Sequence, residues 1–155
     1  MPVFDFLFWT KERGDFLADD GPVIPVTIGI PTILEELCVK KNYQIPTPVT
    51  GYALIDTGAS ISAVHEQVLL DLGVQPLDSI PTHTPHGDGR SFVYPAKVSF
   101  PALSIHDYGM GRLMGCELKW RTKDGKEIIM LLGRDLLSQI LFTYSGMASI
   151  ITVSY

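Results

Sequence analysis

Short runs of apolar residues, separated by clusters of proline and glycine, dominate the pattern of this chain. The sequence contains 11 prolines and 14 glycines, residues that end strands and form turns. Apolar runs of this length that are rich in valine and isoleucine are typical of β-strands. The expected strands cover residues 23–30, 51–55, 79–84, 91–100, 127–133 and 147–155.

Two segments follow a helical period instead. Residues 64–73 place apolar side chains three and four positions apart and end at a glycine, where a helix would stop. Residues 136–141 form a shorter amphipathic segment. The pattern therefore predicts an all-β fold class, mainly β with one or two short helices. Residues 33–48, which end in a proline-rich stretch, are expected to form an excursion from it.

The length of 155 residues suits one ordinary domain. We expect an N-terminal arm over residues 1–22 and a single domain over residues 23–155. Within that domain, residues 104–125 carry several glycines and lead into an expected turn at 123–126. The sequence contains no internal repeat and no low-complexity segment.

The composition favours a folded protein that has apolar surface to bury. Hydrophobic residues make up 46% of the chain and charged residues 19%, which argues against disorder. This apolar content suits a core together with a dimer interface or a substrate groove. The net charge is −5, and no basic cluster exceeds Lys40-Lys41. Nucleic acid is therefore not an expected partner.

Neither the cysteines nor the N-terminus points to export or to a membrane. Cys38 and Cys116 lack the spacing of a metal or redox motif, so we expect reduced thiols, with one disulfide as the alternative. The apolar N-terminal stretch is short, contains Asp5 and has no basic start, unlike a signal peptide. No apolar run reaches the roughly 18 residues of a membrane helix. We expect a cytoplasmic protein without a membrane partner.

One turn carries the strongest chemical signal. A short apolar run ends in Asp56-Thr57-Gly58-Ala59-Ser60, a pattern typical of a buried strand that delivers a carboxylate to a tight turn. It resembles the active-site loop of aspartic peptidases. Those enzymes need two such loops and this chain has one, so the resemblance implies that two chains share one site. The alternative is a strand-to-turn transition without a catalytic role.

The implied chemistry needs a pair of carboxylates. Two of them held about 3 Å apart cannot both ionise, so they share one proton. One acts as general base on a water molecule, and the protonated one polarises the scissile carbonyl. In a homodimer the pair would be Asp56 of each chain. Thr57 is expected to tie the two loops together, Gly58 to allow the tight turn, and Ala59 to leave space above the acids.

A second motif lies near the C-terminus. Leu132, Gly133, Arg134 and Asp135 follow a buried apolar run and precede a helical segment. They closely resemble the hydrophobic strand, glycine and helix of retroviral-type aspartic proteases. In that family the strand threads beneath the Asp-Thr-Gly loop, its glycine permits a close backbone crossing, and the arginine braces the dimer. Taken alone, the glycine would only end a strand and the aspartate would only cap a helix.

A hairpin turn lies between the two motifs. It contains His86, Gly87, Asp88 and Gly89, at the position in the chain where this family has a flexible flap that closes over the bound peptide. The glycines would supply hinge freedom and backbone amides that grip a peptide, and such lids also exclude water. The alternative is an ordinary exposed hairpin tip.

With three elements in order, the chain resembles the retropepsin-like aspartic peptidases, in particular short, single-domain, bacterial-type members. The resemblance covers residues 23–155. It implies a closed β-barrel-like acid-protease fold with one lobe per chain, a homodimer with the active site on its two-fold axis, and endopeptidase activity on a peptide or protein substrate. It implies no cofactor. The residues expected to contact substrate are Ala59, Ser60, Ser62, His86, Gly87, Asp88 and Gly89.

The chain departs from the family pattern at several places. Retroviral members typically carry an aspartate where Ser60 stands, and that aspartate pairs with the arginine of the second motif. Arg134 must therefore find another partner. Residues 1–20, 33–48 and 104–125 are additional to a minimal retroviral protease. They could reshape the interface or obstruct the groove, and residues 1–20 could form a removable inhibitory segment.

Other readings of the sequence compete with an active peptidase. A dimerisation or peptide-binding module could keep the fold without cutting. No metal is expected: His83, His86 and Asp88 cluster on the hairpin, but a solvated turn explains them better than a site short of fixed ligands. His65 begins a stretch that looks like a metallopeptidase helix, yet Leu69 stands where the second histidine must be.

Overall fold

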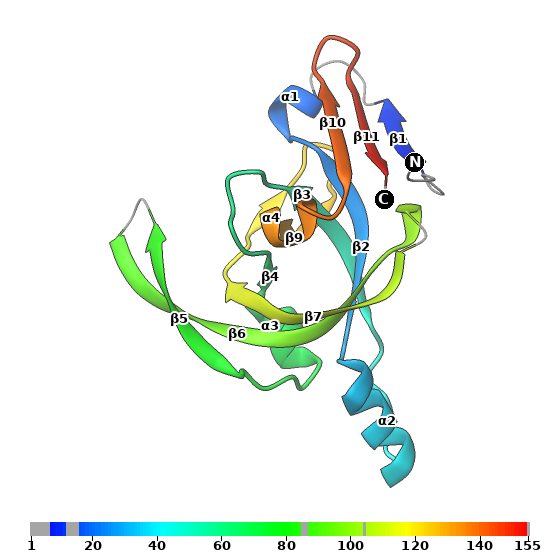
Figure 1. The fold of residues 1–155 in the computed structure, drawn as a ribbon, viewed down its shortest axis with the longest axis vertical. Coiled ribbons are helices and arrows are strands. Elements are labelled where there is room, and N and C mark those ends of the chain that lie inside the picture. The colour runs from blue at the N-terminus through cyan, green and yellow to red at the C-terminus, as the bar shows by residue number, and fades with distance from the viewer. Residues whose placement is uncertain (1–6, 12–15, 85–86, 104, 155) are drawn as a thin grey trace.

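The computed structural model describes residues 7–11, 16–84, 87–103 and 105–154. Its strands form two sheets, and short helices connect the strands (Figure 1). The strands are β1 (Leu7–Lys11), β2 (Val23–Gly29), β3 (Val49–Ile55), β4 (Ala63–His65), β5 (Asp78–Thr84), β6 (Gly87–Phe100), β7 (Ile105–Cys116), β8 (Trp120–Arg121), β9 (Glu127–Leu132), β10 (Leu141–Ser145) and β11 (Ile150–Ser154). The helices are α1 (Phe16–Asp19), α2 (Thr32–Lys41), α3 (Glu66–Asp71), the 3₁₀ helix η1 (Pro101–Leu103) and α4 (Arg134–Leu137).

The larger sheet closes into a barrel. Strands β2, β3, β9, β4, β7 and β6 are hydrogen-bonded in that order, and a pairing between β2 and β6 completes the ring. The pairs β3–β9 and β4–β7 are parallel, and the other pairs of the ring are antiparallel. Closure removes exposed strand edges from the ring itself. The prediction of a mainly β fold built on a closed barrel is confirmed.

The core fills this barrel, and strand patterning explains it. Inward positions of β2 alternate with partly exposed ones, as expected for a strand with one face in the core. Strand β9 differs because residues 128–130 are all buried. Its two edges are paired with β3 and β4, and the burial of three consecutive side chains means that both of its faces are covered. This central strand leads directly into the second motif.

A smaller sheet joins the two ends of the chain. Strand β11 lies between β1 and β10 and is antiparallel to both (Figure 1). Residues 7–11, within the segment that the sequence sets aside as an arm, thus pair along the C-terminal strand. The following helix α1 also contributes to the core, because Leu17 is buried. The Leu17 carbonyl accepts a hydrogen bond of 3.1 Å from the Tyr144 hydroxyl.

The helices differ in part from the expectation. The described residues contain four α-helices instead of one or two. Helix α3 lies where a helix was predicted, and Gly73 follows it with a positive φ of 74°. Helix α4 starts two residues before the expected segment and ends well before residue 141. Residues 33–48 were expected to form an excursion without an assigned structure, and helix α2 occupies much of that stretch.

The sequence assigned no strand to residues 104–125, yet residues 105–116 form the long strand β7. Strand β7 pairs with β6 along most of its length. Gly109 and Gly111 are exposed in it, and a side chain at either would meet nothing within 4 Å, so these glycines do not interrupt the pairing. Among the described residues, no helix is long and apolar enough to cross a membrane.

Candidate active site

Asp56 lies at the mouth of the barrel, where β3 ends. Strand β3 runs parallel to β9, with Ile55 opposite Leu132. The next amide, that of Asp56, donates a 3.0 Å hydrogen bond to the Leu132 carbonyl. The side chain of Asp56 is partly exposed. A partly buried strand of the barrel thus delivers one carboxylate to a turn at the surface.

The turn after Asp56 orients this carboxylate. Its Oδ1 atom accepts hydrogen bonds from the amides of Gly58 at 2.9 Å and Ala59 at 3.2 Å. A Cβ atom at Gly58 would lie 3.1 Å from the same oxygen, so glycine allows the amide to come this close. Such bonds from an aspartate to the backbone two or three residues ahead are a common way to stabilise a turn. They fix one carboxylate oxygen and leave Oδ2 without a partner in the described part of the chain.

The second motif crosses directly behind this turn. A Cβ atom at Gly133 would lie 2.7 Å from the carbonyl carbon of Ile61 and 2.9 Å from the amide nitrogen of Ser62. Real side chains do not tolerate such distances to backbone atoms, so only glycine fits here. The amide of Arg134 then donates a 2.9 Å hydrogen bond to the Ala59 carbonyl. The two motifs, far apart in sequence, form one compact unit.

A buried hydrogen-bond network joins the same two segments. The Ser62 hydroxyl donates to Asp135 Oδ1 at 2.6 Å and accepts a 2.9 Å bond from the Gly133 amide. The Ser62 amide donates to Asp135 Oδ2 at 2.9 Å, and Asp135 Oδ1 also accepts from the Leu136 amide. Ser62 is fully buried. This is a correction to its expected contact with substrate, because its side chain cannot reach the surface of the chain.

Arg134 pairs with backbone carbonyl groups of the turn, in place of the aspartate expected at position 60. Its Nη1 donates to the carbonyl of Thr57 at 2.8 Å and to that of Gly58 at 3.0 Å. The guanidinium group is exposed and therefore clamps the turn from outside. Ser60, which stands where an aspartate was expected, is exposed as well. The turn is thus braced through its backbone carbonyls.

The remaining residues of the turn lie at the surface. Thr57 and Gly58 are exposed and Ala59 is half-buried. Within the described part of the chain, the Thr57 hydroxyl makes no hydrogen bond, so a second copy or a ligand can reach it. The expected roles of these residues toward substrate or a second loop stay predictions.

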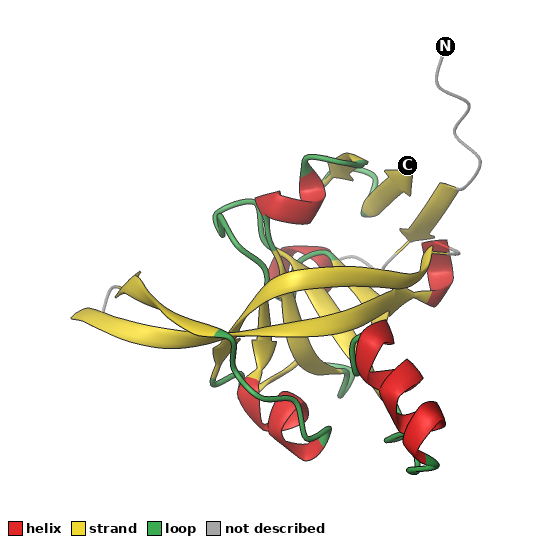
Figure 2. Cartoon of the chain, turned by 60° about the horizontal axis from the view of Figure 1, so that its bottom comes forward, coloured by secondary structure: helices red, strands yellow, loops and turns green. Residues whose placement is uncertain are grey.

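The β5–β6 hairpin projects from the barrel (Figures 1 and 2). Its two strands are paired from Asp78, which lies opposite Val93, to Thr84, which lies opposite Gly87. Gly87, Asp88 and Gly89 are exposed at its outer end, and Gly87 has a φ of 127°, which favours glycine. His86 lies outside the described residues. The hairpin exists where the sequence predicted it, and its role as a flap stays a prediction.

An open hollow of about 400 Å³ borders the carboxylate. Asp56 and Thr57 line one side, and Leu54, Asp20 and Trp120 line others. The indole of Trp120 is 41% exposed. Sequence reasoning missed this surface because it assigned residue 20 to an arm and gave no binding role to Trp120. No local signal marks either position.

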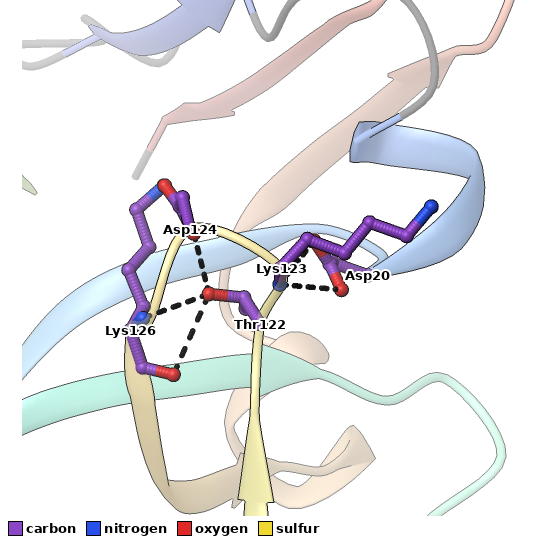
Figure 3. Close-up of polar contacts among 5 residues, drawn as sticks. All are labelled: Asp20, Thr122, Lys123, Asp124 and Lys126. Carbon is purple, nitrogen blue, oxygen red and sulfur yellow. Dashed lines mark hydrogen bonds and ion pairs between the residues drawn. The ribbon is translucent and has the colours of Figure 1, made fainter.

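Contacts between distant segments hold the rim of this hollow (Figure 3). The Lys123 amide donates to both oxygens of Asp20, at 3.1 and 3.3 Å, and Asp20 is almost fully buried. The Lys123 ammonium pairs with Asp19. The buried Thr122 hydroxyl hydrogen-bonds to Asp124 and accepts from the Lys126 amide. These bonds fix the β8–β9 turn and so place the strand that carries the tryptophan.

The structure presents no metal centre in the part of the chain that it describes: no three histidine, cysteine, aspartate or glutamate side chains gather there. His65 accepts a 3.1 Å hydrogen bond at Nδ1 from the Leu118 amide. Cys38 and Cys116 are unpaired. The chemistry that this site offers is therefore that of a carboxylate held by a turn.

No protein-family model and no curated protein matches the chain. Among solved structures, it is similar to the "Solution structure of Simian Foamy Virus (mac) protease", with 17% sequence identity and a TM-score of 0.42. The similarity covers 74% of this chain and 96% of that chain. A likeness at this TM-score carries no weight for activity, which has to be inferred from the residues themselves.

Proposed function

We propose that this protein is an aspartic endopeptidase that acts as a homodimer, with Asp56 of each chain in one shared active site. The observation that carries the proposal is the interlocking of the two motifs. Gly133 packs so closely against the backbone that follows the turn that no side chain would fit there. Arg134 donates hydrogen bonds to the backbone carbonyls of Thr57 and Gly58 within the turn. This bracing holds the turn that carries the carboxylate in one geometry, as a reacting group requires.

The second carboxylate has to come from another chain. Two other acids line the hollow beside Asp56, but both are engaged by Lys123: Asp20 accepts its amide and Asp19 pairs with its ammonium. A two-fold axis next to the exposed Thr57 would bring the same turn of a second copy opposite the first. One proton shared by the two Asp56 side chains then gives one acid and one base.

Hydrolysis follows from that pair. The ionised carboxylate takes a proton from water while the water oxygen bonds to the scissile carbonyl carbon, and the other carboxyl group donates its proton to the carbonyl oxygen. The tetrahedral intermediate collapses when the C–N bond breaks, the leaving nitrogen takes up the proton that came from water, and the second carboxylate takes a proton back from one hydroxyl of the intermediate. The products are a carboxylic acid and an amine, and the dyad is restored to one shared proton.

The surroundings of Asp56 suit an extended peptide. The hollow lined by Leu54 and Trp120 would receive a substrate side chain next to the scissile bond, because indole and aliphatic surfaces favour apolar groups. The hairpin at Gly87–Gly89 would cover the peptide and pair with its backbone, as in strand addition. Closure of such a lid excludes water from the reacting bond.

The test is hydrolysis of a diverse quenched-fluorescent peptide pool from about pH 3 to about pH 8, a range that spans the titration of a carboxylate dyad. Wild type should cleave, and Asp56→Asn should lose at least about 10³-fold in rate, as expected when the group that activates water is removed. Asp71→Asn is the matched control, because it makes the same isosteric change on the exposed surface of α3. Thermal unfolding should show that both variants fold.

Equal hydrolysis by wild type and Asp56→Asn would sink the proposal. A wild-type protein that binds peptides stoichiometrically without turning them over would instead identify a non-cutting peptide-binding module. A single chain supplies only one Asp-Thr-Gly turn. This motivates the second candidate, because peptide binding without cleavage needs no second carboxylate.

A further inference from the structure

Helix α2 exposes apolar side chains that the described part of the chain leaves uncovered. None of its residues is fully buried, and Ile33 is 73% exposed while Leu37 is 47% exposed. These two residues lie four positions apart and so share one face of the helix. Figures 1 and 2 show that α2 projects from the barrel, so this face is open to another molecule.

Charged residues of opposite sign flank this face. Glu36 and Lys40 stand three and seven positions after Ile33, and so lie on the same side of the helix as it. Neither has a hydrogen-bond or ion-pair partner within the described part of the chain. Glu35, by contrast, is held by Lys97 at 2.6 Å, which anchors the helix to the barrel. The exposed face thus carries an acid in its first half and a base in its second half.

A face with this arrangement is complementary to itself. We propose that α2 pairs with α2 of a second copy in antiparallel orientation across a two-fold axis. An antiparallel pair places the first half of one helix against the second half of the other, so Glu36 of each copy meets Lys40 of its partner copy. Leu37 then lies beside the two-fold axis, against Leu37 of the other helix. A two-fold contact uses the same patch twice, which requires such self-complementarity.

This contact is separate from the one that would unite two Asp56 side chains. Helix α2 connects β2 to β3 at the end where Ile28 pairs with Val49, and Asp56 follows the opposite end of β3. A seven-residue strand spans roughly 20 Å. The α2 pair therefore leaves the turn at Asp56 accessible. It is a second, weaker contact, because two helices of ten residues bury little area.

The test is self-association measured by sedimentation across a wide range of protein concentration. Wild type should associate through α2, and Glu36→Lys or Lys40→Glu alone should weaken that association at least about tenfold, because each places like charges together. An equimolar mixture of the two variants should regain it, since every cross-pair is then of opposite charge. Leu37→Ser should also weaken it.

Val39→Ser is the matched control. Val39 is 68% exposed on the other flank of the same helix, so this change lowers apolar exposure without touching the proposed contact, and association should stay at the wild-type level. Because α2 has no fully buried residue, all these variants should fold. Association that is indifferent to Glu36→Lys and Lys40→Glu, or that is not regained on mixing, would overturn the proposal. Peptide hydrolysis is a separate readout, so failure of the peptidase proposal would be seen independently.

Discussion

The Asp56 turn and the β5–β6 hairpin are the two halves of the proposed cleft, and they are held in opposite ways. The turn is fixed by a hydrogen bond that its Asp56 amide donates to β9, by those that Arg134 of α4 donates to it, and by the crossing at Gly133. The hairpin depends on its own two strands, because β5 pairs with β6 alone at the end of the sheet. The turn that carries the carboxylate is therefore held by several contacts with distant segments, whereas the hairpin that would cover the substrate is not.

The transition between the two regions lies within one strand. Along β6, Phe92 is 52% exposed while Val93 and Tyr94 are buried. The hairpin therefore ends and the barrel begins at residue 93. This difference suits a catalytic site, since reacting groups need fixed geometry and a lid needs freedom to open. Matched substitutions in the two regions can test the contrast.

The largest expected difference concerns glycine. Gly133→Ala would force a methyl group against the backbone of Ile61 and Ser62, and we expect a loss of about 3 kcal/mol or more in the free energy of unfolding. Gly89→Ala would meet only the Thr82 hydroxyl at 3.6 Å, so we expect a change within about 0.5 kcal/mol. Urea unfolding of both variants measures this. Equal losses would contradict the contrast between the two regions.

A smaller difference is expected for two serines. Ser62→Ala leaves the buried Gly133 amide without an acceptor and removes a donor to Asp135, which should cost about 2 kcal/mol. Ser79→Ala on the hairpin removes an exposed contact to Arg90, which still donates to the Ser79 carbonyl, so we expect a change within about 0.5 kcal/mol. Chemical denaturation compares the pair. A larger loss for the hairpin serine would show that the hairpin is not the looser region.

The smallest effect concerns the boundary residue Tyr94. Burial, and then its 2.6 Å hydrogen bond to Glu66, raise the pKa of Tyr94 to about 12. The folded state therefore keeps this proton when the unfolded chain has lost it, so stability falls as pH rises above about 10. From about pH 9 to about pH 11 the loss from this group should be roughly 1.4 kcal/mol.

Comparison with Tyr94→Phe isolates that effect. Burial, and then the charge of Glu66, raise the pKa of Cys116 to about 11, so this thiol adds a pH dependence of the same sign to both proteins. The variant should be less stable at neutral pH, because Glu66 loses its donor, but its stability should fall less steeply between about pH 9 and pH 11. Identical slopes for the two proteins would remove Tyr94 as the cause.

The chemical motifs could be predicted from sequence because their physics is local. An apolar run followed by Asp56 and Gly58 specifies a strand and a turn by residue type alone, and a glycine after the buried run at 127–132 does the same for the second motif. The mainly β class follows from short apolar runs separated by proline and glycine, whereas the closed barrel was expected only from the resemblance to retropepsin-like peptidases. The motifs and the strand pattern each depend on only a few neighbouring residues.

The rest depends on contacts between distant segments. The rim of the hollow is set when Asp20 accepts the amide of Lys123, 103 positions later, and no window of sequence reveals that. Ser60 and Ser62 are alike in sequence, yet one is exposed and the other is buried against Asp135. Helix α2 escaped prediction because its apolar residues are divided between two faces and none is fully buried. Leu34 and Cys38 pack against the core, while Ile33 and Leu37 are exposed, so no single buried stripe marks the helix.

The central claim is that Asp56 of two chains forms one site, and subunit mixing tests it most directly. Wild-type and Asp56→Asn chains are mixed in varying proportions, refolded together at constant total concentration, and assayed for peptide hydrolysis. If both carboxylates are needed, activity follows the square of the wild-type fraction, so an equal mixture keeps about a quarter of the wild-type rate. A rate that falls in direct proportion, with about half remaining in the equal mixture, would contradict the shared site.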